Sequence, residues 1–263
     1  MKNKKRLSIW QLAADWSNSP ENREEVVFVE FCRRLKNETR FFCQHDFLDV
    51  FKDSFPKFSV PVKTDDEIYR ARRFPNNYRI LDHRCSTPPF LGFSKTDSFV
   101  PESAKITDTR ANTRGIPCLY AAKSIDTAIS EVRPYKGSHV SVAKIKINRP
   151  LKLFNFSFSE ADLKLDADDF HAKFPPWYIS LSVMFSIPCE NNENGEYLLT
   201  QCISEYLRLY GDFDGIVFPS SLHDKGENVV LFNCKYNTYD ICEPISSSVY
   251  KITDIDVKYE QTL

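Results

Sequence analysis

Glycine is scarce in this sequence: the 263 residues include only seven, and all of them lie at position 92 or later. A Gly-rich loop that surrounds a phosphate with backbone N–H groups is therefore excluded from the first third of the chain. The nucleotide patterns G-x-G-x-x-G and G-x-x-x-x-G-K-[ST] are absent throughout, as are H-E-x-x-H and G-x-S-x-G. Their absence excludes the commonest signatures of dinucleotide-binding, P-loop, zinc-protease and serine-hydrolase proteins.

An excess of either charge is also lacking. The formal net charge is −1 and the sequence pI is about 6.5, which gives no support for a nucleic-acid partner or an anionic membrane surface. No stretch reaches the apolar length of a membrane span, and the basic start MKNKKRLSIW is not followed by the apolar core of a signal peptide. We therefore expect a cytoplasmic protein.

The eight cysteines are scattered, and no two of them form a C-x-x-C pair. Zinc ribbons and thioredoxin-like motifs need such closely spaced thiols. We expect reduced thiols and no metal site.

Apolar and aromatic residues are plentiful: 42% of the sequence is hydrophobic and 21 residues are Phe, which is typical of a globular protein. Short apolar runs predict strands, and repeats at i, i+3, i+4 and i+7 predict helices. Because the two kinds alternate irregularly, the pattern favours an α+β fold over a doubly wound parallel sheet. Strands are expected at 67–74, 118–122, 138–147, 151–156, 214–221 and 228–232, and helices at 125–132, 175–185 and 196–211.

Residues 1–62 contain no glycine and have apolar residues at helical spacing, and they are predicted to form a small helical extension. Helical spacing links Phe28, Phe31 and Leu35, and a helix start is expected near residues 18–21. The segment 55–63, FPKFSVPVK, contains two prolines and is interpreted as a boundary or linker. This gives two predicted parts, a helical extension at 1–62 and a main domain at 63–263.

Arg40 and His45 in the extension form R-x-x-x-x-H, a spacing seen in HEPN ribonucleases. The same spacing arises easily by chance, and aromatic residues surround Arg40 in the sequence. RNA cleavage by the extension stays open as a minor alternative.

The stretch 110–134, RANTRGIPCLYAAKSIDTAISEVRP, combines a cation, a turn, a short strand and an amphipathic helix. Ser124 is positioned to cap the helix, and Glu131 falls on the flank of its apolar stripe. A carboxylate at that position borders whatever surface the helix packs against. Solvated surface Glu is the simpler interpretation of this residue alone.

A serine pair, Ser220 and Ser221, is followed closely by His223 and Asp224. Neighbours within one turn do not form a catalytic triad, because a triad is defined by its geometry. We do not predict a serine hydrolase.

Taken together, these segments resemble the RES domain family, which is named for an arginine, a glutamate and a serine. The resemblance covers about residues 63–235, and the closest-looking members also have a helical extension before the domain. The matching segments in order are YRAR (69–72), the stretch 110–134, YLLTQCISEYLR (197–208), DGIVFPSS (214–221) and NVVLF (228–232).

The resemblance implies an α+β fold similar to that of ADP-ribosyltransferase toxins, with a split, partly barrel-like sheet. It implies a toxin of a bacterial toxin–antitoxin pair that degrades NAD⁺ by phosphorolysis or hydrolysis, with NAD⁺ as substrate and phosphate as a co-substrate in the first case. No resident cofactor is required. A cognate antitoxin or activator protein is the implied partner, and a homodimer is left open.

Carried over by motif, the catalytic residues are Arg110, Glu131 and Ser220, and the residues binding NAD⁺ are Arg70, Arg110, Tyr120 and Ser220. Ala111 departs from the family, since many relatives carry Trp or Met after the arginine, which affects the pocket wall more than the chemistry.

The residues fit this chemistry independently of the resemblance. Cleavage of the nicotinamide–ribose bond needs an anion near the developing oxocarbenium ion, and Glu131 is the candidate. Arg110, together with Arg70, suits the pyrophosphate because a guanidinium binds phosphate in a bidentate manner. Tyr120 is assigned to nicotinamide stacking or a ribose hydroxyl, and Ser220 to phosphate or ribose.

Two further alternatives remain at this point. One is an ADP-ribosyltransferase that modifies a protein, and the other is a RES-fold regulatory or binding module without catalysis. The presence of the arginine, glutamate and serine positions argues against the second.

Overall fold

The computed structural model describes residues 23–41, 44–74, 92–187 and 197–256. Its centre is one eight-stranded sheet in the order β1-β5-β6-β7-β3-β2-β4-β8, in which only β5 and β6 pair in parallel. The strands are β1 (Ser59–Val62), β2 (Glu67–Arg73), β3 (Leu119–Ala122), β4 (His139–Ile147), β5 (Leu151–Asn155), β6 (Gly215–Pro219), β7 (Glu227–Leu231) and β8 (Cys242–Lys251).

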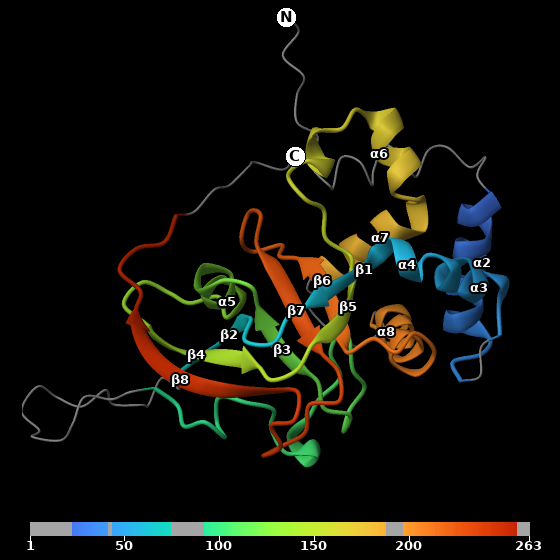
Figure 1. Cartoon of the computed structure of the whole chain (residues 1–263). Helices are drawn as coiled ribbons and strands as arrows, with labels where there is room; N and C mark the ends of the chain where they lie inside the picture. Colours follow the sequence, from blue (N-terminus) through green and yellow to red (C-terminus); the bar gives the residue numbers. More distant parts are fainter. Residues whose placement is uncertain (1–22, 42–43, 75–91, 188–196, 257–263) are drawn as a thin grey trace, which may run out of the picture.

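Helices cover the sheet unevenly (Figure 1). α7 and α8 pack on β6, and α2 packs on α7 and α8 as an outer layer, with α3 beside it. α5 packs instead on β2, β3, β4 and β7. The helices are α2 (Arg23–Asn37), α3 (Asp46–Asp53), α4 (Phe55–Phe58), α5 (Ile125–Glu131), α6 (Ala167–Lys173), α7 (Pro176–Ser186) and α8 (Leu198–Tyr210).

The α+β class is confirmed by this mixed sheet, and most expected elements are found within two residues of their predicted bounds. Local signals explain the agreement. Ser124 accepts a hydrogen bond from Thr127 N and caps α5, and α8 ends where Gly211 follows it. β1, α6 and β8 were not expected from the sequence.

The segment 55–63 is not a linker, and that part of the prediction was wrong. It forms α4 and then β1, which pairs with β5 at the edge of the sheet. Pro56 stands in the first turn of α4, where its missing N–H has no intrahelical partner to lose. Pro61 is tolerated because an edge strand offers one side that needs no ladder hydrogen bond.

The extension and the main domain share one aromatic core. Phe47 stacks on Phe51 and meets the edge of Trp177, and Phe51 contacts Phe154 of β5. Phe31, Phe47, Phe51, Phe154 and Trp177 are each at most 1% exposed. Each such ring removes a large apolar area from water, so α2 and α3 are tied to α7 and the sheet by the hydrophobic effect.

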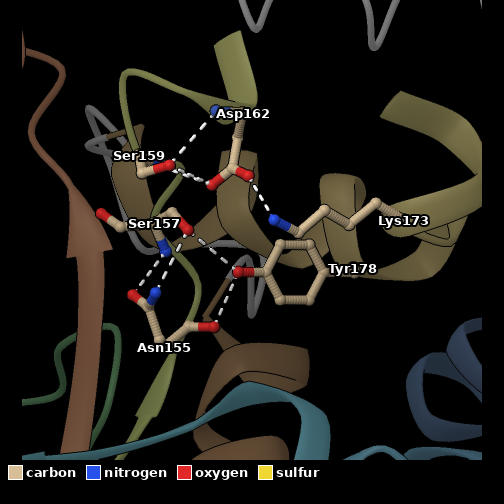
Figure 2. A network of polar contacts seen from close by, with 6 residues as sticks. All are labelled: Asn155, Ser157, Ser159, Asp162, Lys173 and Tyr178. Atoms are coloured by element: carbon tan, nitrogen blue, oxygen red, sulfur yellow. Dashed lines mark hydrogen bonds and ion pairs between the residues drawn. The ribbon is translucent and has the colours of Figure 1, made fainter. Parts of the chain in front are cut away.

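A separate polar network fastens the chain that follows β5 (Figure 2). Asp162 accepts hydrogen bonds from Ser159 N and Ser159 Oγ through one oxygen and pairs with Lys173 Nζ, 2.5 Å away, through the other. Nearby, Tyr178 Oη donates to the carbonyls of Asn155 and Ser157. The network links the loop after β5 to α6 and α7.

Candidate functional site

The sheet opens between β2 and β3, which pair at a single position, Tyr69 with Ala122. Beyond that position Arg70 Nη1 donates to the carbonyl of Tyr120, 2.8 Å away, in place of a further ladder bond. A pocket of about 370 Å³ lies over this opening, near the lower end of the range of about 300–1,000 Å³ for small-molecule sites. Its lining includes Tyr69, Arg70, Asp108, Arg110, Tyr120, Glu131, Tyr197, Phe218 and Asn228.

Glu131 contributes a carboxylate to the pocket, and it is the last residue of α5. Its Oε1 accepts two hydrogen bonds, from Ser220 Oγ and from Asn228 Nδ2, both at 2.7 Å. Among the residues that the structure describes, no hydrogen bond engages Glu131 Oε2. One carboxylate oxygen is thus fixed by the protein, and the other has no partner among the hydrogen bonds of the described residues.

Ser220 stands behind Glu131, not in the pocket lining. Its hydroxyl donates to Glu131 and accepts from the backbone N–H groups of Leu222 and His223, each at 3.1 Å. A hydroxyl has one donor and two acceptor sites, and all three are used. The geometry therefore makes Ser220 an orienting group for Glu131, and its predicted contact with phosphate or ribose remains untested.

Arg110 borders the pocket and is anchored to the end of α7. Its Nη1 donates to the carbonyls of Phe185, at 2.7 Å, and Ser186, at 3.2 Å. Carbonyls in the last turn of a helix have no intrahelical partner and favour a cation, which explains the local stability of this contact. Arg110 thus joins the helical layer to the pocket edge, and no hydrogen bond among the described residues engages its other nitrogens.

Gln201 holds the turn that carries Arg110. Gln201 is a polar residue of α8 and is only 9% exposed. Its Nε2 donates to the carbonyls of Thr109, at 2.8 Å, and Asn112, at 3.0 Å. A buried polar residue of the helix thus satisfies the backbone of a distant turn, and helical periodicity alone does not reveal that partner.

Arg70 carries the least satisfied cation of the pocket. Its Nε is buried and has no hydrogen-bond partner among the described residues, while Nη1 is bonded to Tyr120 O. Burial, with Arg72 nearby, lowers the pKa of the Arg70 guanidinium to about 10. A buried cation without an anion is costly, so an anionic ligand in the pocket would gain from pairing with it.

Tyr120 lines the pocket, and its hydroxyl is hydrogen-bonded to the turn that carries Arg110. The hydroxyl accepts from Ala111 N at 3.0 Å, donates to Asn112 Oδ1 at 2.9 Å and also contacts Thr109 Oγ1. Burial raises the pKa of this phenol, so it stays neutral. The ring face remains for stacking, whereas the hydroxyl braces the Arg110 turn.

Asn228 was missed by the sequence reasoning. It lies in β7, is 5% exposed and lines the pocket beside Glu131. The available signal was an Asn at the start of the apolar run NVVLF, since a buried amide in a strand requires a polar partner. That partner, Glu131, is 97 residues away in the chain and could not be named from the sequence.

Arg40 and His45 lie far from this pocket and border a groove of about 930 Å³ beside α8. His45 Nδ1 accepts from Phe47 N and caps α3, and its ring packs 5.6 Å from that of Phe31. These contacts give His45 a structural role at the start of a helix.

Taken as a class, this is an α+β domain whose sheet opens onto a pocket whose lining includes the oriented carboxylate of Glu131 and the guanidinium groups of Arg70 and Arg110. The family model "RES domain" matches residues 71–247, more than half of the chain. The chain belongs to the RES domain family.

A similar solved structure comes from the MbcT–MbcA toxin–antitoxin complex of M. tuberculosis. The similarity covers 76% of this chain and 91% of that chain, with 12% sequence identity and a TM-score of 0.41. Among curated proteins no sequence matches. Within the described residues, no helix has the length and apolar character that a bilayer span requires.

Proposed function

We propose that this protein cleaves the nicotinamide–ribose bond of NAD⁺. The observation that carries the proposal is the Glu131 carboxylate, which has Oε1 fixed by Ser220 and Asn228 and lines a pocket that Arg70 and Arg110 also line. None of the hydrogen bonds described for these three charged groups joins the carboxylate to a guanidinium. The pocket thus offers a negative and a positive subsite at once.

The chemistry requires both charges. When the bond between nicotinamide N1 and ribose C1′ breaks, the electron pair leaves with nicotinamide, which becomes neutral without an added proton. Positive charge develops on C1′ and the ring oxygen, and a fixed carboxylate beside them stabilises it. Water or phosphate then forms the new bond to C1′, and the proton of water is released.

The guanidinium groups suit the pyrophosphate of the same molecule. Arg110 is held at the pocket edge by α7, and Arg70 is a second guanidinium in the pocket lining. A pocket of about 370 Å³ suits one half of a dinucleotide, so the adenosine half would extend outside it. The Tyr120 ring offers a surface on which nicotinamide can stack.

Phosphate as the attacking group is the finer part of this proposal. One guanidinium can bind the pyrophosphate while the other receives a small anion near the ribose. Phosphorolysis needs that second cation, whereas hydrolysis does not. The expected product is then ADP-ribose-1″-phosphate beside nicotinamide.

Removal of NAD⁺ from a growing cell stops growth, so the proposal includes a toxic activity restrained by a partner protein. Family resemblance is the ground for this part. Expression of the chain alone in bacteria is expected to lower cellular NAD⁺ and arrest growth, and Glu131→Gln is expected to relieve both.

Product analysis of the purified protein tests the proposal. NAD⁺ is incubated with the protein, with and without inorganic phosphate, and the products are identified by mass spectrometry. Nicotinamide with ADP-ribose-1″-phosphate supports phosphorolysis, and nicotinamide with free ADP-ribose at a phosphate-independent rate supports hydrolysis. ADP-ribose attached to protein would support a transferase instead. Intact NAD⁺ together with cleaved RNA in a parallel incubation would contradict the proposal.

A further inference from the structure

The turn that carries Ser220 is attached to α5 at two points. Ser220 Oγ donates to Glu131 in the last turn of the helix, and His223 Nδ1 lies 2.8 Å from Thr127 Oγ1 in the first. Thr127 and Glu131 are four residues apart, so they share one face of α5. The turn thus spans one helical repeat and contacts both of its ends.

The Thr127–His223 contact is enclosed. Thr127 is 1% exposed, and its hydroxyl also lies 2.8 Å from Ser124 Oγ, the cap of α5. A Cβ added to Gly226 would lie 2.6 Å from Thr127 Oγ1 and 2.8 Å from His223 Nδ1. Backbone therefore packs directly against the pair, and only glycine fits beside it.

Hydrogen bonds within the turn connect His223 to Ser220. The N–H of His223 donates to Ser220 Oγ, and Gly226 closes the turn by donating to His223 O and accepting from Ser220 N. The Ser220 hydroxyl points its proton at Glu131 because its acceptor sites are occupied by backbone N–H groups. A shift of His223 would move one of these donors and free the hydroxyl to rotate.

We propose that Thr127 and His223 are positioning residues that orient the Glu131 carboxylate through Ser220. This inference rests on the proposed function, in which Glu131 stabilises the charge that develops on the ribose. Neither residue lines the pocket, so neither contributes to substrate affinity. Their loss should reduce turnover and leave substrate binding unchanged.

Steady-state release of nicotinamide from NAD⁺ tests this role. Thr127→Val and His223→Ala should each lower kcat about tenfold, the order expected for one lost orienting hydrogen bond, with KM unchanged. Thr127→Ser and His223→Asn keep polar atoms at these positions and should restore most of kcat. The double variant Thr127→Val/His223→Ala should lose no more than either single variant, because both remove one contact.

Ser221→Ala is the matched control. Ser221 is exposed in the same turn, next to Ser220, and should leave both kcat and KM at the wild-type value. Wild-type kcat in both Thr127→Val and His223→Ala would overturn the positioning role.

Hydrogen exchange gives a readout that does not depend on NAD⁺ cleavage. The amides of Leu222 and His223 donate to Ser220 Oγ, so their exchange should accelerate in Thr127→Val and stay unchanged in Ser221→Ala. Unchanged exchange in Thr127→Val would show that the contact between Thr127 and His223 does not hold the turn, and would overturn the inference. If the wild type released no nicotinamide, the proposed function would fail, and the exchange rates would still decide whether Thr127 and His223 hold the turn.

Discussion

Glu131 and Asp162 are two carboxylates with similar hydrogen bonds to serine but different surroundings. Each accepts a hydrogen bond of 2.7 Å from a serine hydroxyl, Ser220 in one case and Ser159 in the other. Asp162 uses both of its oxygens and pairs with Lys173, as Figure 2 shows. Glu131 uses one oxygen and meets no cation in the contacts described for it.

The difference separates a structural carboxylate from one prepared for a ligand. Burial alone would raise the pKa of Asp162, but its bonds to Lys173 and Ser159 outweigh burial and lower it. Its charge is compensated within the fold and stabilises the loop after β5. Glu131 and Arg70 line a pocket instead, and no described ion pair compensates either charge, which is costly for stability and useful for binding opposite charges.

Glu131→Gln should give the largest effect on activity. The amide oxygen of Gln can still accept from Ser220 and Asn228, so the fold is retained, while the negative charge is lost. We expect NAD⁺ cleavage to fall by about 10³-fold, the scale found when a group that stabilises a charged transition state is removed. Thermal unfolding should change little. Full activity in this variant would leave Glu131 with a structural role only, as the acceptor for Ser220 and Asn228.

Arg70→Met should lower kcat/KM for NAD⁺ by about 10²-fold, through a raised KM, since one charge-assisted contact with phosphate is worth roughly 1.5–3 kcal/mol. The melting temperature should stay equal to or exceed that of the wild type, because a buried, poorly paired charge has been removed. Inorganic phosphate should stabilise the wild type against heat and leave the variant unaffected. A large loss of stability with an unchanged KM would assign Arg70 to the fold.

Asp162→Asn should lower stability and leave activity unchanged, the reverse of Arg70→Met. The amide turns one hydrogen-bond donor toward Lys173 or Ser159, and we expect a loss of about 1–3 kcal/mol of stability with normal turnover per folded molecule. Because the pKa of Asp162 is lowered in the folded state, its contribution is complete above the ordinary carboxyl pKa of about 3.9 and disappears as the pH falls through the lowered value. Denaturant unfolding should therefore show wild type and variant converging in acid. A constant gap across that range would contradict this account.

Asn228→Ala should have the smallest of these effects. It removes one of two donors to Glu131 Oε1 and leaves Ser220 in place. A drop of about tenfold in kcat is expected, since one hydrogen bond to a charged group contributes roughly 1.5 kcal/mol or more. Asn228→Gln is a useful companion, because its amide can reach the carboxylate only with a changed geometry. Equal activity in wild type and Asn228→Ala would show that Ser220 alone suffices.

Features that depend on near neighbours could be predicted from the sequence. The cap at Ser124, the apolar face of α8 and the alternation in β4 are local signals, and the structure has all three elements. Motif resemblance supplied the pocket residues Arg70, Arg110, Tyr120 and Glu131, which all line one cavity.

Features that depend on distant partners could not be predicted. Pro61 argues against a strand until one knows that β1 lies at the sheet edge. Gln201 has a polar side chain, and only the fold brings the Thr109 turn within hydrogen-bond distance of its amide. The same holds for His223, whose neighbours in the sequence suggest a hydrolase and whose neighbour in space is Thr127.

The spacing of the Glu131 partners along the chain has a consequence for the order of synthesis. Ser220 and Asn228 follow the glutamate by 89 and 97 residues, so both of these later segments must be synthesised before the carboxylate can be oriented. The aromatic residues of α2 and α3 likewise cannot complete their packing until α7, with Trp177, and α8 have been synthesised. A nascent or prematurely terminated chain therefore contains the charged residue without its alignment. Whatever chemistry this pocket performs begins only after the last strands of the sheet have left the ribosome.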